Sequence, residues 1–306
     1  MSKKHKIYLA VLAVVVILFL VTKLNDKTER KISFFEVDST KIECIEITTI
    51  EDTLRLVKKD NSWFMEYPIE CPASPNKIER FFEKVLSIKT SNLPISEQES
   101  SFETYNLTDS LSTIIKLYGK DDKLLDVSMI GKSSSYSNTP ARKQGKNKIY
   151  RLEENIAYDI KTESSNWRKR EVLELEKEQI AKISVIYENI GYELTATDTL
   201  WQFEDGENSV SIQHDNPALR TILNSLSKVN VSQFIDEDIE NYLIKLQNPT
   251  LEIGINMYDE SKYYLRAAFD NDNKYVLQVN NETEHLYTIN ENWLKKFRKQ
   301  AEDFRK

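Results

Sequence analysis

Side chains that commonly form metal sites are scarce in this sequence of 306 residues. Its three histidines are His5, His214 and His285, and the sequence contains neither an H-x-x-x-H nor a C-x-x-C pair. Zinc sites need closely spaced His and Cys ligands of this kind. We therefore predict no metal site.

The glycines argue against nucleotide chemistry. All six occur as single, scattered residues, and neither G-x-x-x-x-G-K-[ST] nor G-x-G-x-x-G is present. Loops that hold phosphates need such glycines, because the backbone N–H groups must come close to the ligand. We predict no cofactor and no ATP hydrolysis, so any transporter that works with this chain would need a separate motor subunit.

A hydrolytic centre is the remaining catalytic possibility. His214 and Asp215 lie near Ser209 and Ser211. However, adjacent residues on a strand or turn point in different directions, and no G-x-S-x-G motif is present. The acidic stretch at 270–273 lacks the glycine and final glutamate of an EF-hand and predicts a hairpin turn. We predict no catalytic residues and no enzymatic activity.

The charge balance excludes a general nucleic-acid binder. The chain has 42 Lys+Arg and 49 Asp+Glu, a formal net charge of -7. Proteins that bind nucleic acids need clustered positive charge against the phosphates. With 40% hydrophobic and 30% charged residues, the composition is that of a globular protein long enough for two domains.

The N-terminal segment predicts a membrane anchor. Three lysines within the first six residues precede an unbroken apolar run over residues 7–21. A helix over residues 7–24 would be roughly 27 Å long, close to the ~30 Å hydrocarbon core, and Lys6 and Lys23 can extend to the interfaces. A cleaved signal peptide is the alternative, but no small-residue cleavage site follows the run.

The charges beside the anchor bear on its orientation. The short basic tail favours a cytoplasmic N-terminus and a body outside the cytoplasm, although the other flank is also basic and the contrast is modest. Residues 1–31 would then comprise a cytoplasmic tail, the transmembrane anchor and a stalk. The remaining body carries 35 basic and 47 acidic residues, so charge alone would not hold it on an anionic membrane.

The body contains two similar halves. Residues 42–47 and 180–185 both alternate apolar and polar residues, the pattern of a half-buried strand. These segments are 138 residues apart, and so are Trp63 and Trp201. Each tryptophan begins the second strand of an expected hairpin and is interpreted as a core residue.

A helix is expected after each hairpin. One opens at Ser74-Pro75 and the other at Asn216-Pro217, where Ser or Asn can cap the helix and Pro suits its first position. Apolar stripes with helical spacing follow. They contain Ile78, Phe81, Phe82, Val85 and Ile88 in the first helix, and Leu219, Ile222, Leu223, Leu226 and Val229 in the second.

The later elements also repeat. A strand pair, a short strand and a closing helix are expected in each half, with residues 156–160 matching residues 293–297. We predict an α+β fold: an N-terminal transmembrane helix followed by two tandem repeats of an antiparallel sheet packed on helices. The first repeat covers residues 32–161 and the second covers residues 180–306.

Residues 162–179 form a charged connector without Gly or Pro between the repeats. Trp167, Arg168 and Arg170 within it are candidates for contact with a partner protein. The alternative is that the tryptophan packs on a domain and the arginines meet local acidic residues.

A polar stretch at 131–148 supplies further candidates. Its basic residues, Arg142 and Lys143 among them, have no acidic residue nearby in the stretch. The segment is long enough for a mobile binding loop, and the alternative is a solvated hairpin loop.

The two cysteines, Cys44 and Cys71, fall in or beside expected strands. A disulfide between them is possible outside the cytoplasm, and two unpaired thiols are the simpler interpretation.

Several segments together resemble one known family. They are the N-terminal apolar run, Ser62-Trp63-Phe64, the helix start at Ser74-Pro75, and the stretches at 105–109, 129–132, 148–151 and 167–170. This combination resembles a bacterial membrane-anchored family known as domain of unknown function 4340 (DUF4340), most clearly over the first repeat and the connector. The family commonly has glycine where this chain has Asn106, and asparagine tolerates the left-handed backbone that glycine adopts.

The resemblance implies an accessory role in the cell envelope. Genes of the family often lie beside genes for ABC-type exporters, including exporters linked to gliding motility, and the resemblance supplies no catalytic residues. We therefore expect a single-pass protein of the inner (cytoplasmic) membrane with a periplasmic body. It would contact the bilayer through residues 7–24 and bind other membrane or envelope proteins, ABC transporter subunits among them. The alternative is a protein that binds an envelope glycan or lipid in a cleft between the repeats.

Overall fold

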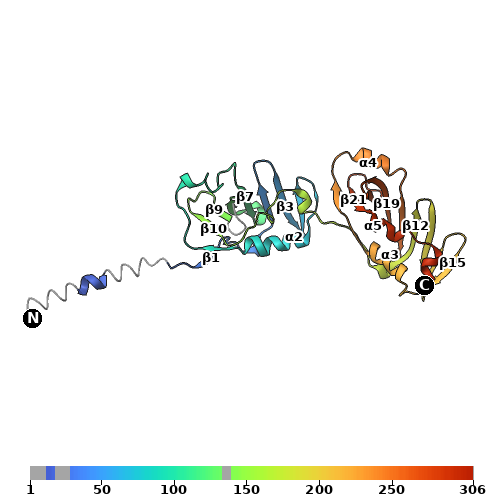
Figure 1. Ribbon diagram of the computed structural model, residues 1–306. Coiled ribbons are helices and arrows are strands. Elements are labelled where there is room, and N and C mark those ends of the chain that lie inside the picture. The colour runs from blue at the N-terminus through green and yellow to red at the C-terminus, as the bar shows by residue number, and fades with distance from the viewer. Residues whose placement is uncertain (1–11, 18–27, 133–138, 306) are drawn as a thin grey trace, which may run out of the picture. The chain divides into compact units, whose positions relative to one another are not determined.

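The computed structural model describes residues 12–17, 28–132 and 139–305 (Figure 1). The chain divides into two compact units, Met1–Arg168 and Lys169–Lys306. Both units consist mainly of antiparallel sheet with a few helices, which confirms that part of the predicted α+β fold. The division falls inside the predicted connector, whose residues fold as parts of the two units.

The predicted membrane anchor, residues 7–24, lies mostly outside the described residues. Residues 12–17 are helical, and Leu12 and Ile17 have exposed side chains. None of the helices in the described part of the chain has the length and apolar character needed to cross a membrane. The anchor and its orientation stay predictions.

The first unit contains a ten-stranded sheet in the order β1-β6-β10-β9-β8-β7-β2-β3-β4-β5. A helix, α2 (Pro75–Arg80), continues as the π-helical turn η2 (Phe81–Leu86). The strands are β1 (Lys31–Ser33), β2 (Cys44–Thr48), β3 (Thr53–Lys59), β4 (Ser62–Tyr67), β5 (Cys71–Pro72), β6 (Lys89–Ser91), β7 (Thr113–Tyr118), β8 (Leu124–Ile130), β9 (Thr139–Lys143) and β10 (Ile149–Leu152). Short 3₁₀ segments are η1 (Ser39–Lys41), η3 (Glu99–Ser101), η4 (Lys120–Asp122) and η5 (Ser164–Asn166).

The second unit contains a nine-stranded sheet in the order β15-β14-β13-β12-β18-β19-β20-β21-β17, and a separate pair, β11 with β16. The strands are β11 (Glu171–Glu174), β12 (Ile180–Tyr187), β13 (Ile190–Ala196), β14 (Trp201–Glu204), β15 (Ser209–Ile212), β16 (Lys228–Asn230), β17 (Gln233–Ile235), β18 (Leu251–Met257), β19 (Lys262–Asn271), β20 (Lys274–Val279) and β21 (Leu286–Asn290). The helical segments are η6 (Lys177–Gln179), α3 (Pro217–Ser227), α4 (Ile239–Lys245), α5 (Glu291–Leu294), η7 (Lys295–Phe297) and α6 (Ala301–Phe304).

The two units pair equivalent strands in the same order. From one sheet edge, β5-β4-β3-β2-β7-β8-β9-β10 in the first unit corresponds to β15-β14-β13-β12-β18-β19-β20-β21 in the second. In the first unit β6 pairs with both β10 and β1. In the second unit β17 pairs with β21, and β16 pairs with β11. This is the arrangement expected of two copies of one scaffold.

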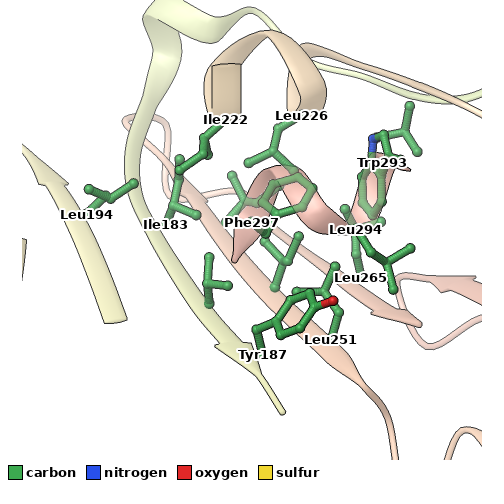
Figure 2. Packing of buried hydrophobic residues seen from close by; sticks show 14 of the residues in the cluster. Ile183, Tyr187, Leu194, Ile222, Leu226, Leu251, Leu265, Trp293, Leu294 and Phe297 are labelled. Carbon is green, nitrogen blue, oxygen red and sulfur yellow. The ribbon is translucent and has the colours of Figure 1, made fainter. Parts of the chain in front are cut away.

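Each sheet packs its larger core against one helix, α2 after β5 in the first unit and α3 after β15 in the second. Ser74 Oγ accepts a hydrogen bond from the N–H of Lys77, and Asn216 Oδ1 accepts one from the N–H of Leu219, so both predicted caps are confirmed. Figure 2 shows Ile222 and Leu226 of α3 near Phe297 in the core of the second unit. Burial of these apolar stripes is the main source of stability of each unit.

A smaller apolar cluster covers the opposite face of each sheet. Neighbouring residues on a strand face opposite sides, and Met129 belongs to this smaller cluster while Ile130 belongs to the larger core. The same division separates Ala268 from Ala267 in the second unit, where α4 lies over the smaller cluster. The segments that follow α2 and α3 in the chain therefore cover the second face.

The prediction of a closing helix in the first repeat is wrong. Residues 153–160 form turns, although Ile156 and Ile160 are buried as the apolar pattern required. The side chain of Asn155 accepts a hydrogen bond from the N–H of Ala157, at 2.9 Å, and such local bonds compete with helix formation. The second repeat does close with short helices, α5 and α6.

Cys44 and Cys71 do not form a disulfide. Cys44 lies on β2 and Cys71 on β5, and β3 and β4 separate these strands in the sheet. Adjacent strands are about 4.8 Å apart, so the two cysteines are well beyond the reach of an S–S bond.

Candidate functional site

Trp167 is a core residue of the first unit. Its side chain is completely buried (0% exposed), and its indole N–H donates a hydrogen bond to the carbonyl of Lys161 at 2.6 Å. The ring lies 5.9 Å from that of Phe81, centroid to centroid, and the Lys77 ammonium lies 5.1 Å from the ring centre. Of the two interpretations of the connector tryptophan, the structure supports packing on a domain.

The two arginines beside this tryptophan differ in exposure. Arg168 is buried and pairs through its backbone with Ala73 in the same unit. Arg170 is exposed, and its carbonyl accepts a hydrogen bond from Val231 N–H at 3.0 Å within the second unit. Only Arg170 of the three connector candidates therefore offers its side chain to a partner.

Arg142 and Lys143 lie on β9 and not in one long loop as predicted. The loop prediction is wrong because the run TPARK pairs with β8 and β10 despite its polar appearance. Arg142 is 7% exposed, donates to the carbonyl of Leu107 at 3.0 Å, and lies 4.0 Å from the ring centre of Phe102. Arg142 therefore holds the segment that contains Phe102 and Leu107 against the second face of the sheet. Residues 133–138 lie outside the described chain.

Lys143 has a similar internal role. Its ammonium pairs with Asp126, donates to Ser128 Oγ at 2.9 Å, and lies 4.5 Å from the ring centre of Phe34. Burial lowers the pKa of Lys143, and the Asp126 carboxylate partly opposes that shift. Arg142 and Lys143 thus stabilise the first unit through contacts with its own residues.

A cavity of about 480 Å³ in the second unit is the candidate site. It lies where β12 begins and β13 ends, between that end of the sheet and helix α3, and we call it the Trp201 cavity. Its lining residues are Lys177, Glu178, Ile180, Ala196, Trp201, His214, Asp215, Arg220, Leu223, Asn224 and Tyr258.

The base of the Trp201 cavity is apolar. Trp201 is 3% exposed and pairs across the sheet with Ala196 and Ile212. Ile180, at the start of β12, and Leu223, from α3, complete this surface. Trp201 is therefore a core residue, as predicted, and it also lines the cavity.

The rim of the cavity is charged. Lys177, Glu178, Asp215 and Arg220 line it, and none of these four makes an ion pair with another residue in the described part of the chain. Binding sites for small molecules commonly combine an apolar base with a few polar groups that orient the ligand. The arrangement can accept a molecule with an apolar body and charged or hydrogen-bonding groups.

The possible hydrolytic cluster is not assembled in the structure. The hydroxyl of Ser211 donates to Gln202 Oε1 at 3.1 Å, and Ser209 Oγ accepts from the amide of Gln202. Both serines are thus engaged on the surface of the sheet, whereas His214 lines the cavity. The described residues also contain no group of three His, Cys, Asp or Glu side chains arranged to hold a metal ion.

In the first unit, the position equivalent to the Trp201 cavity is filled by an aromatic ring. Trp63 corresponds to Trp201, and its ring lies 5.8 Å from that of Phe82, centroid to centroid. Phe82 corresponds to Leu223 in the helical stripe of the second unit, and both Trp201 and Leu223 line the cavity. Leucine is smaller than phenylalanine, so the difference between Leu223 and Phe82 is the signal in the sequence that indicates this site.

Comparisons with known proteins add one result. No curated protein and no solved structure matches the chain. A family model described as "Domain of unknown function (DUF4340)" matches residues 63–249, about three fifths of the sequence, and this span includes every residue of the Trp201 cavity except Tyr258. The chain therefore belongs to the DUF4340 family.

Proposed function

We propose that this chain is a single-pass protein of the inner membrane that acts by binding other molecules outside the cytoplasm. The Trp201 cavity is the observation that carries the binding role, because its four charged rim residues make no ion pair with any residue that the structure describes. The apolar run over residues 7–24 supports the anchored location. No catalytic step is part of the proposal.

The proposed location is tested by protease treatment of spheroplasts. A C-terminal epitope tag would report the body of the chain. We expect the tag to be lost on treatment of intact spheroplasts, as for a periplasmic protein. Protection of the tag until the membrane is lysed would place the body in the cytoplasm and contradict the proposal.

The partners that we propose are membrane or envelope proteins, ABC transporter subunits among them. Support comes from the family resemblance and from the exposed rim residues. A photoreactive amino acid at Asn224, which lines the cavity, should yield a specific crosslinked partner in cells, whereas the same group at exposed Lys296, outside the cavity, is the matched control. Equal products at both positions, or none at Asn224, would contradict partner binding at this site.

A small envelope molecule, such as a glycan or a lipid, is the second candidate for the cavity. Its volume of about 480 Å³ suits a small ligand, and every lining residue belongs to the second unit. This differs from the predicted binding in a cleft between the two repeats. Native mass spectrometry of the full-length chain in mild detergent should show a bound molecule that Leu223→Phe removes. The same bound mass in wild type and variant would exclude this cavity as the ligand site.

A further inference from the structure

A second cavity, of about 490 Å³, lies in the same unit on the face of the sheet covered by α4. Thr288 of β21 lines it, and this residue pairs across the sheet with Val276, which belongs to the apolar cluster under α4. We call it the α4 cavity. Its lining residues are Gln233, Phe234, Ile235, Asp236, Glu237, Asp238, Tyr242, Asp270, Asn271, Lys274 and Thr288.

The α4 cavity is acidic. Asp236, Glu237 and Asp238 form an exposed acidic rim, whereas the almost fully buried carboxylate of Asp270 is paired with Lys245. Lys274 is the single basic residue of the lining. The field in the cavity therefore favours a positively charged group.

One wall of the cavity already holds an ammonium group. The Nζ of Lys245 lies 2.5 Å from Asp270 Oδ1 and 5.1 Å from the ring centre of Tyr242. A carboxylate and an aromatic face are the two features that bind ammonium and guanidinium groups most effectively in proteins. The contacts of Lys245 thus show that the groups along this wall can bind an ammonium group.

The hydroxyl of Thr288 points to an occupant independently of the acidic residues. Thr288 is 6% exposed, and its Oγ1 has no hydrogen-bond partner among the described residues. Buried hydroxyls in native proteins nearly always have a partner, because an unpaired one is costly. A hydroxyl oxygen accepts hydrogen bonds from N–H donors, so an incoming ammonium or guanidinium group would satisfy it.

The geometry favours an organic cation over a metal ion. In the part of the chain that the structure describes, no three His, Cys, Asp or Glu side chains converge as metal ligands. The ring of Tyr242 beside the carboxylate also suits an organic cation, which gains from contact with an aromatic face.

We propose that the α4 cavity binds a primary ammonium or guanidinium group carried on a flexible chain. This chemistry is shared by the lysine and arginine side chains of a partner protein and by free alkylamines. The site is separate from the Trp201 cavity, so the proposal does not depend on the function proposed above.

Calorimetric titration of the full-length chain in detergent micelles tests the proposal. The probes are a short acetylated, amidated peptide with one central lysine, the same peptide with glutamine in its place, and cadaverine. We expect the lysine peptide or cadaverine to bind and the glutamine peptide not to bind. Tighter binding of the peptide identifies a protein side chain as the source, and tighter binding of cadaverine identifies a free amine.

Two pairs of variants locate the binding. Thr288→Val removes the hydroxyl at nearly constant volume, and Glu237→Gln removes a rim charge; each should weaken binding by about threefold or more. The matched controls are Thr195→Val, at an exposed position of β13, and Glu240→Gln, next to the rim but outside the lining. Both controls should bind as the wild type does.

Folding of Thr288→Val is checked separately by its melting temperature. Because the hydroxyl has no hydrogen-bond partner within the described ranges of the chain, the melting temperature should not fall, and weaker binding then reflects the lost contact. The proposal is overturned if neither cation binds at about 10 mM. It is equally overturned if Thr288→Val and Glu237→Gln bind as tightly as their controls.

Discussion

The carbonyl oxygen of Tyr105 occupies the space that a side chain at position 131 would need. A Cβ atom added to Gly131 would lie 2.1 Å from that oxygen and 2.9 Å from the ring of Pro140. The N–H of Gly131 also donates to the carbonyl of Pro140 at 2.8 Å. The end of β8 is thereby fixed against the segment that covers the second face of the first sheet.

Gly131→Ala is therefore expected to destabilise the first unit by about 3 kcal/mol, since backbone atoms must move to admit the methyl group. The matched control is Gly191→Ala, where the nearest atom to an added Cβ is 3.8 Å away and little change is expected. Chemical denaturation of both variants measures the difference. Equal free energies of unfolding would show that the contact with Tyr105 is not a constraint.

Asn106, next to this contact, provides a test of backbone conformation. Its φ of 55° is left-handed, which agrees with the interpretation of asparagine as a substitute for the glycine common in the family. Asn106→Gly should change the free energy of unfolding by less than about 1 kcal/mol, whereas Asn106→Val should cost about 2 kcal/mol or more because β-branched residues avoid this region. Similar stabilities of the two variants would argue against the assigned conformation.

The parts of the fold that the sequence predicts well depend on local patterns. Ser74 and Asn216 cap helices that begin at the following proline, and strands alternate as expected around Trp63 and Trp201. Caps, turns and amphipathic stripes act over a few residues, so the printed sequence contains them in full. The constant spacing between these signals predicts two similar halves, and the two units do pair equivalent strands in the same order.

Features decided by distant residues were missed. Strand β9 lacks an apolar alternation and exists because β8 and β10 pair with it from both sides. The sequence predicts a loop at Arg142 because its contacts are distant in the chain. The carbonyl of Leu107, which accepts its hydrogen bond, and the ring of Phe102, which its guanidinium contacts, are 35 or more residues away. Tertiary context of this kind overrides local propensity.

The Trp201 cavity shows the same limit. The sequence alone singles out His214, Asp215 and Trp201. Their proximity to Lys177 and Tyr258 depends on how five separate segments meet at the end of a sheet. Sequence periodicity does not report where such segments leave empty space.

Asp159 links helix α2 to the turn that replaces the predicted closing helix. Its side chain is 6% exposed, pairs with Arg80, and lies 3.7 Å from the Lys77 ammonium. Asp159→Asn should lower the free energy of unfolding of the first unit by about 2 kcal/mol, because two cations lose a buried carboxylate. The control is Glu154→Gln, whose partner Lys84 is exposed, and it should cost less than about 0.5 kcal/mol. A cost for Asp159→Asn no greater than that of the control would contradict this role.

Cys44 should make stability depend on alkaline pH. Burial raises the pKa of its thiol from the ordinary 9.0 to about 11, with the Arg55 guanidinium acting in the opposite direction. The folded state therefore keeps a proton that the unfolded state releases, so this contribution is complete below pH 9 and is lost as the pH rises through about 11.

Unfolding measured between pH 8 and pH 11 checks the expectation for Cys44. The stability of the wild type should fall more steeply with pH than that of Cys44→Ala. Cys71→Ala, which removes a thiol from β5 of the same sheet, is the control for losing a thiol as such. Parallel pH profiles for wild type and Cys44→Ala would exclude the effect.

Exchange of the residues at positions 82 and 223 tests whether the Trp201 cavity is the unfilled counterpart of a packed position. Phe82→Leu should leave a gap beside Trp63 and cost the first unit about 1–2 kcal/mol. Leu223→Phe should enter existing space beside Trp201 and cost the second unit less than about 0.5 kcal/mol, in contrast to the 1–3 kcal/mol typical when a filled core receives extra atoms. Native-state hydrogen exchange resolves the two units separately. A larger cost for Leu223→Phe than for Phe82→Leu would mean that the cavity is not available to a ring at position 223, and the same result would weaken its assignment as a binding site.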